Sequence, residues 1–192
     1  TGEAAASLGF EAARVFDELD PLERHKDAYF TQAGIKRGRA QMKALGNISK
    51  EAIEYLAESN KPADKRNTER YEALNANPMI RFVLLDSVAN VICPAVKLWN
   101  TGHGANVMRE AVSLMGGYGI TEDCPGFLGY KWMDAQLEAT YEGPEAVQRR
   151  QLSITMTNEL FLAQFRQWIG QMRGIASDRA GTGACTLATA MQ

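Results

Sequence analysis

Hydrophobic residues recur at three- and four-residue steps along almost the whole chain, which is the spacing of one face of a helix. In the first such segment, residues 2–39, Pro21 interrupts the pattern and predicts a helix boundary, because proline lacks a backbone donor. A second helical stretch then runs from residue 22 to residue 45 and on to Gly46. Ser49 predicts the N-cap of a short further helix.

The most apolar positions lie in residues 78–115 and predict buried helix. Pro94 is expected to kink that helix. Residues 100–104 contain two glycines, so they predict either a break or a weak spot within one long helix. A later helix is expected from about residue 148 to residue 172, and its apolar positions cover more than one face.

No stretch shows sustained alternation of apolar and polar residues, so strands are not expected. The predicted fold is therefore all-α, an up-down antiparallel helical bundle over residues 1–173. Residues 174–192 are rich in Gly, Ala, Ser and Thr and are expected to form a flexible tail or an interaction arm.

Composition narrows the function classes. The formal net charge of −2 argues against nucleic-acid binding, since no excess of Lys and Arg neutralises phosphates. Charged residues break the longest apolar stretch, so no membrane span is expected. Cys93, Cys124 and Cys185 are far apart, which predicts neither a disulfide framework nor a structural zinc site and fits a reducing compartment.

Other polar groups favour ordinary surface roles. His25 and His103 lie in no recognisable catalytic signature. The acidic residues of 17–23 are scattered by helical spacing, so no metal site is expected. The polar stretch 59–77 is either a basic docking patch or a solvated connection between helices, and its mixed charges favour the connection.

Two short motifs depart from helical patterning. Gly116, Gly117 and Gly119 end an apolar helix and leave backbone amides open to an anionic group, although a plain helix stop has the same sequence. Glu142 lies between helices, in Tyr141-Glu142-Gly143-Pro144, where a carboxylate can face a cleft. Partial desolvation beside Tyr141 would favour a general base, whereas an exposed glutamate before a helix is the alternative.

Together these motifs resemble the carboxyl-terminal signature of the acyl-CoA dehydrogenase family. The likeness extends from about residue 99 to residue 155, and its motifs keep the family's spacing. They are the turn Leu114-Met115-Gly116-Gly117-Tyr118-Gly119-Ile120-Thr121, then Met133-Asp134-Ala135, Tyr141-Glu142-Gly143 and Val147-Gln148-Arg149.

The resemblance implies a helical domain that packs against FAD and assembles into dimers or tetramers. Glu142 would remove the α-proton of an acyl-CoA thioester while a hydride leaves the β-carbon for FAD. The backbone amide of Glu142 would polarise the thioester carbonyl, with Tyr141 and Gly143 also at the substrate. Gly116, Gly117 and Gly119 would contact the FAD of a neighbouring subunit, and the cofactor positions also include Ser113 and Pro144.

The chain also departs from the family pattern. Ser113 replaces a frequent glutamine, Pro144 replaces a threonine, and the segment Met133-Asp134-Ala135-Gln136 lacks two family cations. The amino-terminal and middle domains that hold most of the flavin are not found in these residues. A non-catalytic helical assembly module and an acyl-CoA oxidase are therefore alternatives to the dehydrogenase.

The family also implies partners and a location. The expected partners are an acyl-CoA substrate, the missing flavin-binding domains, a second copy of the chain, and an electron-transferring flavoprotein as acceptor. The expected role is fatty acid metabolism in the cytoplasm, or in the mitochondrial matrix of a eukaryote.

Overall fold

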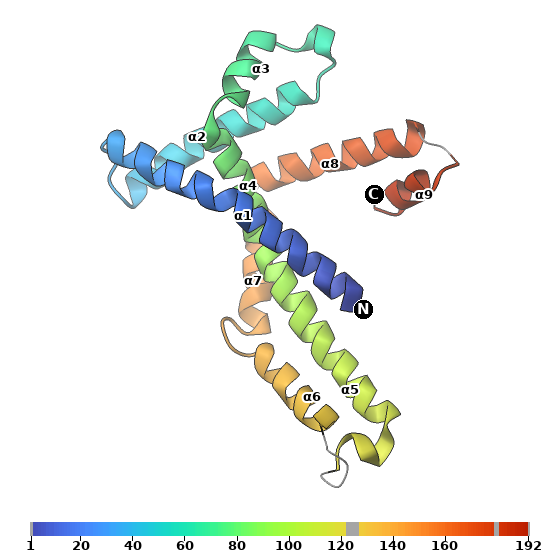
Figure 1. The fold of residues 1–192 in the computed structure, drawn as a ribbon. Helices are drawn as coiled ribbons and strands as arrows, with labels where there is room; N and C mark the ends of the chain where they lie inside the picture. Colours follow the sequence, from blue (N-terminus) through green and yellow to red (C-terminus); the bar gives the residue numbers. More distant parts are fainter. Residues whose placement is uncertain (1, 122–126, 179–180, 192) are drawn as a thin grey trace. The chain divides into compact units, whose positions relative to one another are not determined.

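A computed structural model describes residues 2–121, 127–178 and 181–191, and these residues form helices joined by turns, with no strand among them (Figure 1). This confirms the all-α class. The helices are α1 (Gly2–Gln32), α2 (Arg39–Ser59), η1 (Ala63–Lys65), α3 (Thr68–Asn75), α4 (Pro78–Lys97), η2 (Leu98–His103), α5 (Gly104–Leu114), η3 (Gly116–Gly119), α6 (Phe127–Glu138), α7 (Glu145–Thr155), α8 (Glu159–Asp178) and α9 (Gly183–Ala190). Cys124 lies outside the described residues.

The chain divides into two units. Unit 1 consists of residues 1–16 and 89–156, and unit 2 of residues 17–88 and 157–192. The boundary therefore crosses α1 and α4. Each unit has its own set of packed helices, and the single domain expected over residues 1–173 stays a prediction.

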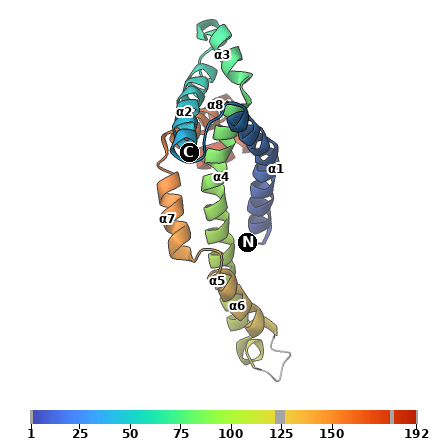
Figure 2. The same ribbon diagram turned by 90° about the vertical axis from the view of Figure 1, so that its left-hand side faces the viewer.

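Unit 1 is built around α5 and α6, which pack along each other as a helical hairpin (Figures 1 and 2). The short helix η3 follows α5 and contacts both helices of the hairpin. At the other end, η2 contacts α6 and α7. The amino-terminal part of α1 joins this unit through Asn100, whose Nδ2 donates to the carbonyl of Ala5 at 3.2 Å.

Unit 2 holds three of the largest fully buried side chains, Phe30, Leu74 and Ile80. Helix α2 packs against α3 and α8, and α9 packs against α8. Gln164 is a buried polar residue of α8, and its amide donates to the carbonyl of Leu84 and to the Ser87 hydroxyl. This satisfies a group whose burial without partners would cost stability.

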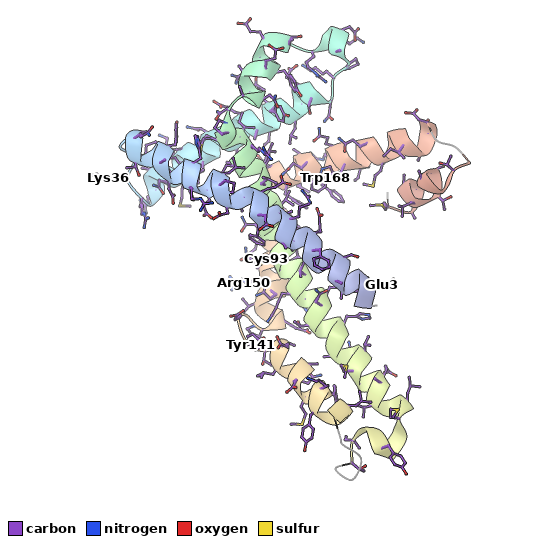
Figure 3. All side chains as sticks on the ribbon, in the orientation of Figure 1. Glu3, Lys36, Cys93, Tyr141, Arg150 and Trp168 are labelled. Carbon is purple, nitrogen blue, oxygen red and sulfur yellow. The ribbon has the colours of Figure 1, made fainter. Side chains whose placement is uncertain are left out.

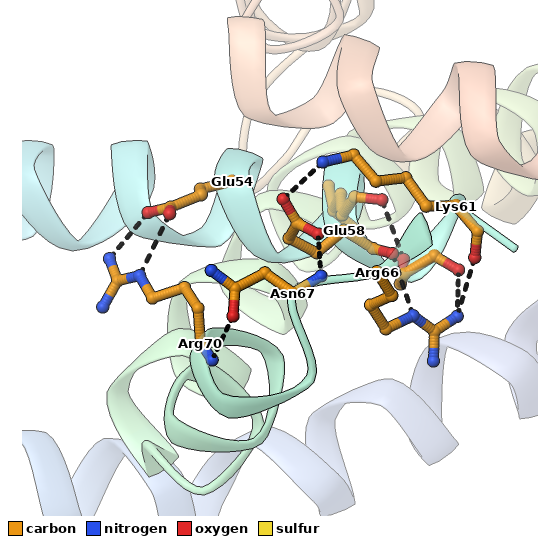
Figure 4. A network of polar contacts seen from close by, with 8 residues as sticks. Glu54, Glu58, Lys61, Arg66, Asn67 and Arg70 are labelled. Carbon is orange, nitrogen blue, oxygen red and sulfur yellow. Dashed lines mark hydrogen bonds and ion pairs between the residues drawn. The ribbon is translucent and has the colours of Figure 1, made fainter. Parts of the chain in front are cut away.

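The polar stretch 59–77 connects helices in unit 2, as its mixed charges favour (Figure 4). Arg70 makes a two-pronged contact with the Glu54 carboxylate at 3.0 and 2.6 Å. Arg66 donates to backbone carbonyls at the end of α2, and Lys61 pairs with Glu58. The Lys61 ammonium and the Asn67 amide hold the pKa of Glu58 below its ordinary value of 4.5. Local acceptors thus occupy these cations.

Two expected boundaries in the first third of the chain are wrong. Helix α1 continues through Pro21 to Gln32. Proline removes one backbone hydrogen bond of the helix, and because Pro21 is exposed, this loss does not end the helix. The turn falls at residues 33–38, where Gly38 has φ of 90°. Ser49 is not an N-cap: it lies inside α2, and its hydroxyl donates to the carbonyl of Leu45.

The later helices show one confirmed alternative and one further correction. Residues 100–104 are a weak spot rather than a break, because helix continues from α4 through the π-helical turn η2 into α5. The helix expected over residues 148–172 is instead two helices, α7 and α8. Asn158 separates them, since its side chain accepts from the amides of Leu160 and Phe161.

The segment 174–192, expected to be a flexible tail or an interaction arm, is helical in its described part, and its role stays a prediction. Helix α8 continues to Asp178, and α9 packs on α8 with Ala188 buried. The Thr182 side chain accepts from the amide of Cys185 and caps α9. Helical structure therefore extends beyond residue 173.

One helical run in the described part of the chain, Pro78–Leu114, is long and apolar enough to cross a bilayer by length and composition alone. Its most apolar window of 18 residues has a mean hydropathy of 1.7, and a third of it is buried. The core helix of a soluble protein passes the same test. The absence of a membrane span thus stays a prediction.

Candidate functional site

The loop between α6 and α7 carries Glu142, and Tyr141 marks its position in Figure 3. Helix α6 ends at Glu138, and Pro144 precedes the first residue of α7, so Glu142 lies between two helices as the sequence predicts. Glu142 has φ of 52° and is the one non-glycine residue with positive φ in the described ranges. Residues other than glycine disfavour positive φ, so the surrounding contacts must hold the loop in this conformation.

Two side chains bind the backbone of this loop. Lys97, at the end of α4, donates from Nζ to the carbonyls of Glu138 at 2.7 Å and Tyr141 at 2.9 Å. Gln148, in the second turn of α7, donates from Nε2 to the carbonyl of Glu142 at 3.2 Å. The loop is thus anchored to two helices of unit 1, on both sides of Glu142.

Gly143 allows this close approach. Its φ is 99°, and a Cβ atom at this position would overlap the Gln148 amide nitrogen. A larger residue would therefore displace Gln148 from the carbonyl of Glu142 and strain the backbone as well. The close contact with Gln148 thus requires glycine at position 143.

The Tyr141 side chain contacts Glu138 and Lys97. Its hydroxyl donates to the Glu138 carboxylate, and the Lys97 ammonium lies 4.7 Å from the centre of its ring. The hydrogen bond to Glu138 raises the pKa of Tyr141 above its ordinary value of 10.0, and the negative charge of Glu142 adds to this shift.

The desolvation expected at Glu142 is not found in this chain by itself. Glu142 is exposed, and Tyr141 retains 42% of its accessible surface. Within the described ranges, no side chain donates a hydrogen bond to the Glu142 carboxylate or forms an ion pair with it. The carboxylate is therefore free to meet a ligand.

The glycine turn forms the other end of the hairpin. Gly116 has φ of 58°, and nothing lies within 4 Å of a Cβ built on either Gly116 or Gly117. Gly119 is buried, and its added Cβ would lie 2.7 Å from the carbonyl oxygen of Val112. Gly119 therefore allows η3 to pack on α5, whereas Gly116 and Gly117 leave exposed backbone that a ligand can approach.

The two motifs lie at opposite ends of α6 (Figure 1). This helix has 12 residues, which corresponds to a length of about 18 Å at 1.5 Å per residue. Gly116 and Glu142 therefore do not form one small site within the chain. This separation suits two different contacts, one at each end of the hairpin.

The predicted cofactor positions fit FAD in part. The exposed backbone at Gly116 and Gly117 has room for a phosphate group. Ser113, in the last turn of α5, is also exposed, so its hydroxyl is accessible. Pro144 has a fixed φ of −60° as the residue before α7 and has no amide proton to donate.

Sequence patterns missed Lys97 and Gln148 as parts of the site. Lys97 reads only as a charge that interrupts an apolar stretch, and Gln148 only as part of a motif. Both side chains bind backbone carbonyls, and such contacts produce no recognisable pattern in the sequence. A lysine at the end of an apolar helix, where its ammonium must find acceptors, is the one available signal.

The remaining candidates for chemistry have partners of their own. The His103 ring contacts the Trp99 ring in a tilted arrangement, with ring centres 4.8 Å apart, and Glu18 pairs with Arg81. No group of three or more His, Cys, Asp or Glu side chains in the described part of the chain is arranged to hold a metal ion. Cys93 and Cys185 are free thiols.

Comparison with known families identifies the segment that contains the loop. Residues 71–156 match the model of the acyl-CoA dehydrogenase C-terminal domain, which confirms the resemblance of the motifs. No curated protein and no solved structure matches the chain significantly. The match covers both ends of the hairpin and the Glu142 loop.

The left-handed conformation of Glu142 predicts a stability difference between two uncharged variants. The free energy of unfolding of Glu142→Asn should be about 0.5–1 kcal/mol larger than that of Glu142→Gln, because asparagine tolerates positive φ better than glutamine. Chemical denaturation of both variants measures this difference. Gln136, in the last turn of α6, is the matched control position with ordinary helical backbone: Gln136→Asn should be slightly destabilising there. Equal stabilities at position 142 would contradict the strained conformation.

Proposed function

We propose, from the match of residues 71–156 to the acyl-CoA dehydrogenase C-terminal domain model, that Glu142 is the general base of an FAD-dependent acyl-CoA dehydrogenase. The observation that carries the proposal is the conformation of Glu142. A non-glycine residue is held at positive φ by side chains from two helices, at the position of the family's base. Strained backbone that its surroundings maintain is a frequent mark of functional positions.

The proposed reaction removes two hydrogens from an acyl-CoA thioester. The Glu142 carboxylate takes the proton from the α-carbon, and the electron pair of that bond becomes part of the new double bond to the β-carbon. FAD, when bound, accepts the hydride that leaves the β-carbon, and the product is a trans-2-enoyl-CoA. Because a thioester α-proton is weakly acidic, donors to the carbonyl oxygen must stabilise the developing enolate charge.

The exposure of Glu142 supports a role for the flavin-binding domains in covering its carboxylate. A general base works best where water is excluded, and this chain leaves the carboxylate open. We assign its cover to the amino-terminal and middle flavin-binding domains of the complete enzyme. Tyr141 and Gly143 then lie against the substrate, beside the carboxylate.

The same proposal places FAD contacts at the far end of the hairpin. Gly116 and Gly117 offer open backbone to the FAD of a neighbouring subunit, with Ser113 nearby on α5. Gly119 shapes this turn through its packing on Val112, and Pro144 contributes only its rigid backbone. An electron-transferring flavoprotein is the proposed acceptor, and the cytoplasm or the mitochondrial matrix is the proposed location, with a role in fatty acid metabolism.

A hydrophobic face of unit 1 supports assembly with a second copy. Tyr130, Met133 and Leu137 follow each other at helical spacing on α6 and are 59%, 67% and 60% exposed. Leu114 and Tyr118, beside the glycine turn, are also exposed. Exposed apolar residues at this density mark interaction surfaces. A second copy covering this face brings its flavin to Gly116 and Gly117.

The base assignment predicts the behaviour of Glu142→Gln in the complete flavoenzyme. The amide cannot take a proton, so acyl-CoA-dependent reduction of the flavin should slow by about a thousandfold or more, while FAD remains bound. Glu110→Gln is the matched control, since Glu110 is an exposed glutamate of α5 paired with Arg109. Stopped-flow absorbance of the flavin measures the rate.

Two results would contradict this assignment. Unchanged flavin reduction in Glu142→Gln would remove the role of base. Absence of FAD from the complete assembly would favour a non-catalytic helical module, the alternative suggested by Pro144 and by the missing cations of residues 133–136. Reoxidation of the reduced flavin by oxygen would identify an acyl-CoA oxidase.

The apolar face predicts a change of oligomeric state. Met133→Glu places a charge at the centre of the face and should shift the protein toward monomer in sedimentation velocity experiments. Met42→Glu is the matched control, because Met42 is 72% exposed on α2, a helix that is not part of this face. An unchanged oligomer in Met133→Glu would contradict assembly through this surface.

A further inference from the structure

The ammonium group of Lys97 makes three contacts, all of them with the end of α6 and the loop that follows. Its ammonium donates to the carbonyls of Glu138 and Tyr141 and lies over the ring of Tyr141. The last carbonyls of a helix have no partners within the helix, and they carry partial negative charge. A lysine ammonium is a compact charge with three donors, so it suits several acceptors arranged around one point.

The contacts of Lys97 and Gln148 fix the two peptide groups that flank Glu142. The carbonyl of Tyr141 belongs to the same planar peptide group as the amide of Glu142, and Lys97 binds it. The carbonyl of Glu142 belongs to the next peptide group, and Gln148 binds that one. With both planes held, φ and ψ of Glu142 are fixed, and so is the direction of its side chain.

We propose that Lys97 is the positioning residue of Glu142, an inference that rests on the proposed role of Glu142 as base. Lys97 holds the peptide plane before Glu142 and thereby maintains the left-handed conformation that presents the carboxylate. Loss of the ammonium releases the carbonyls of Glu138 and Tyr141 together. The loop then relaxes toward negative φ, and the carboxylate moves from the place where it meets the α-proton.

The same contact prepares the Glu142 amide as a donor. The chain has no cis peptide among its described residues, so the N–H of Glu142 points away from the carbonyl that Lys97 binds. In the described part of the chain this N–H has no acceptor. A cation on the carbonyl polarises the peptide group and strengthens its N–H as a donor, by roughly 10–30% for hydrogen bonds in series. Lys97 thus supports both a positioned base and a free amide beside it.

The local structure explains why Lys97 reaches this loop. Lys97 is the last residue of α4, and the π-helical turn η2 starts at the next residue. The Thr101 hydroxyl donates to the carbonyl of Lys97 at 2.7 Å and supports this wider turn. Because η2 contacts both α6 and α7, the turn brings Lys97 to the junction of these two helices.

A purely structural lysine would stabilise the end of α6 without affecting catalysis. Two measurements separate the roles. Hydrogen–deuterium exchange of the full chain reports on the hydrogen-bonded amides of Thr140 and Tyr141 independently of turnover. Steady-state kinetics of the complete flavoenzyme separates kcat from KM. The variants are Lys97→Met, which keeps the stem, and Lys97→Arg, which keeps the charge; Lys131→Met, an exposed lysine of α6, is the control.

We expect Lys97→Met to raise the exchange rates of the Thr140 and Tyr141 amides, which donate to the carbonyl of Leu137, about tenfold, with α5 amides unchanged. Its kcat should fall by about 10- to 100-fold, as for a displacement of a catalytic group by about 1 Å, while KM stays within about twofold. Lys97→Arg should recover part of both effects, and Lys131→Met should match the unaltered protein.

Unchanged exchange at Thr140 and Tyr141 in Lys97→Met would overturn the proposal, as would raised exchange with unchanged kcat. These outcomes differ from a failure of the base assignment, which shows as an active Glu142→Gln variant. In that case the exchange rates still decide whether Lys97 orders the loop.

Discussion

Two carbonyl groups flank Glu142, and each accepts a hydrogen bond from a side chain of another helix. This pair of contacts is the constraint on which the candidate site depends, because it holds a glutamate in a conformation that glutamate avoids. A typical hydrogen bond contributes about 1 kcal/mol, and a bond to a charged group more. Lys97 and Gln148 together therefore suffice against the cost of about 1–3 kcal/mol for left-handed backbone.

The rest of unit 1 serves this arrangement by fixing where helices end. Helix α6 must stop at Glu138 for its last carbonyls to face Lys97, and α7 must start after Pro144 for Gln148 to reach back to the loop. At the opposite end of α6, Gly119 packs η3 on α5 and leaves the glycine turn open. The hairpin thus presents two distinct surfaces, and Glu142 and the glycines act on different partners.

Periodicity was sufficient for the helical class and for the place of Glu142 between helices, since both are local properties. It failed where distant contacts decide. Helix α1 passes through Pro21 because one lost hydrogen bond does not end a helix of this length, and Asn158 divides an apolar stretch that looks continuous. Lys97 was missed because its acceptors lie 41 and 44 residues away and belong to the backbone. The exposure of Glu142 likewise depends on neighbours that its own sequence does not encode.

The central claim is that this loop presents the Glu142 carboxylate to the α-carbon of an acyl-CoA thioester. A crystal structure of the complete flavoenzyme with a thioester analogue that cannot be oxidised tests it most directly. The account predicts positive φ at Glu142 and a carboxylate oxygen about 3–3.5 Å from the α-carbon. A different carboxylate at the α-carbon, with Glu142 directed to solvent, would contradict it.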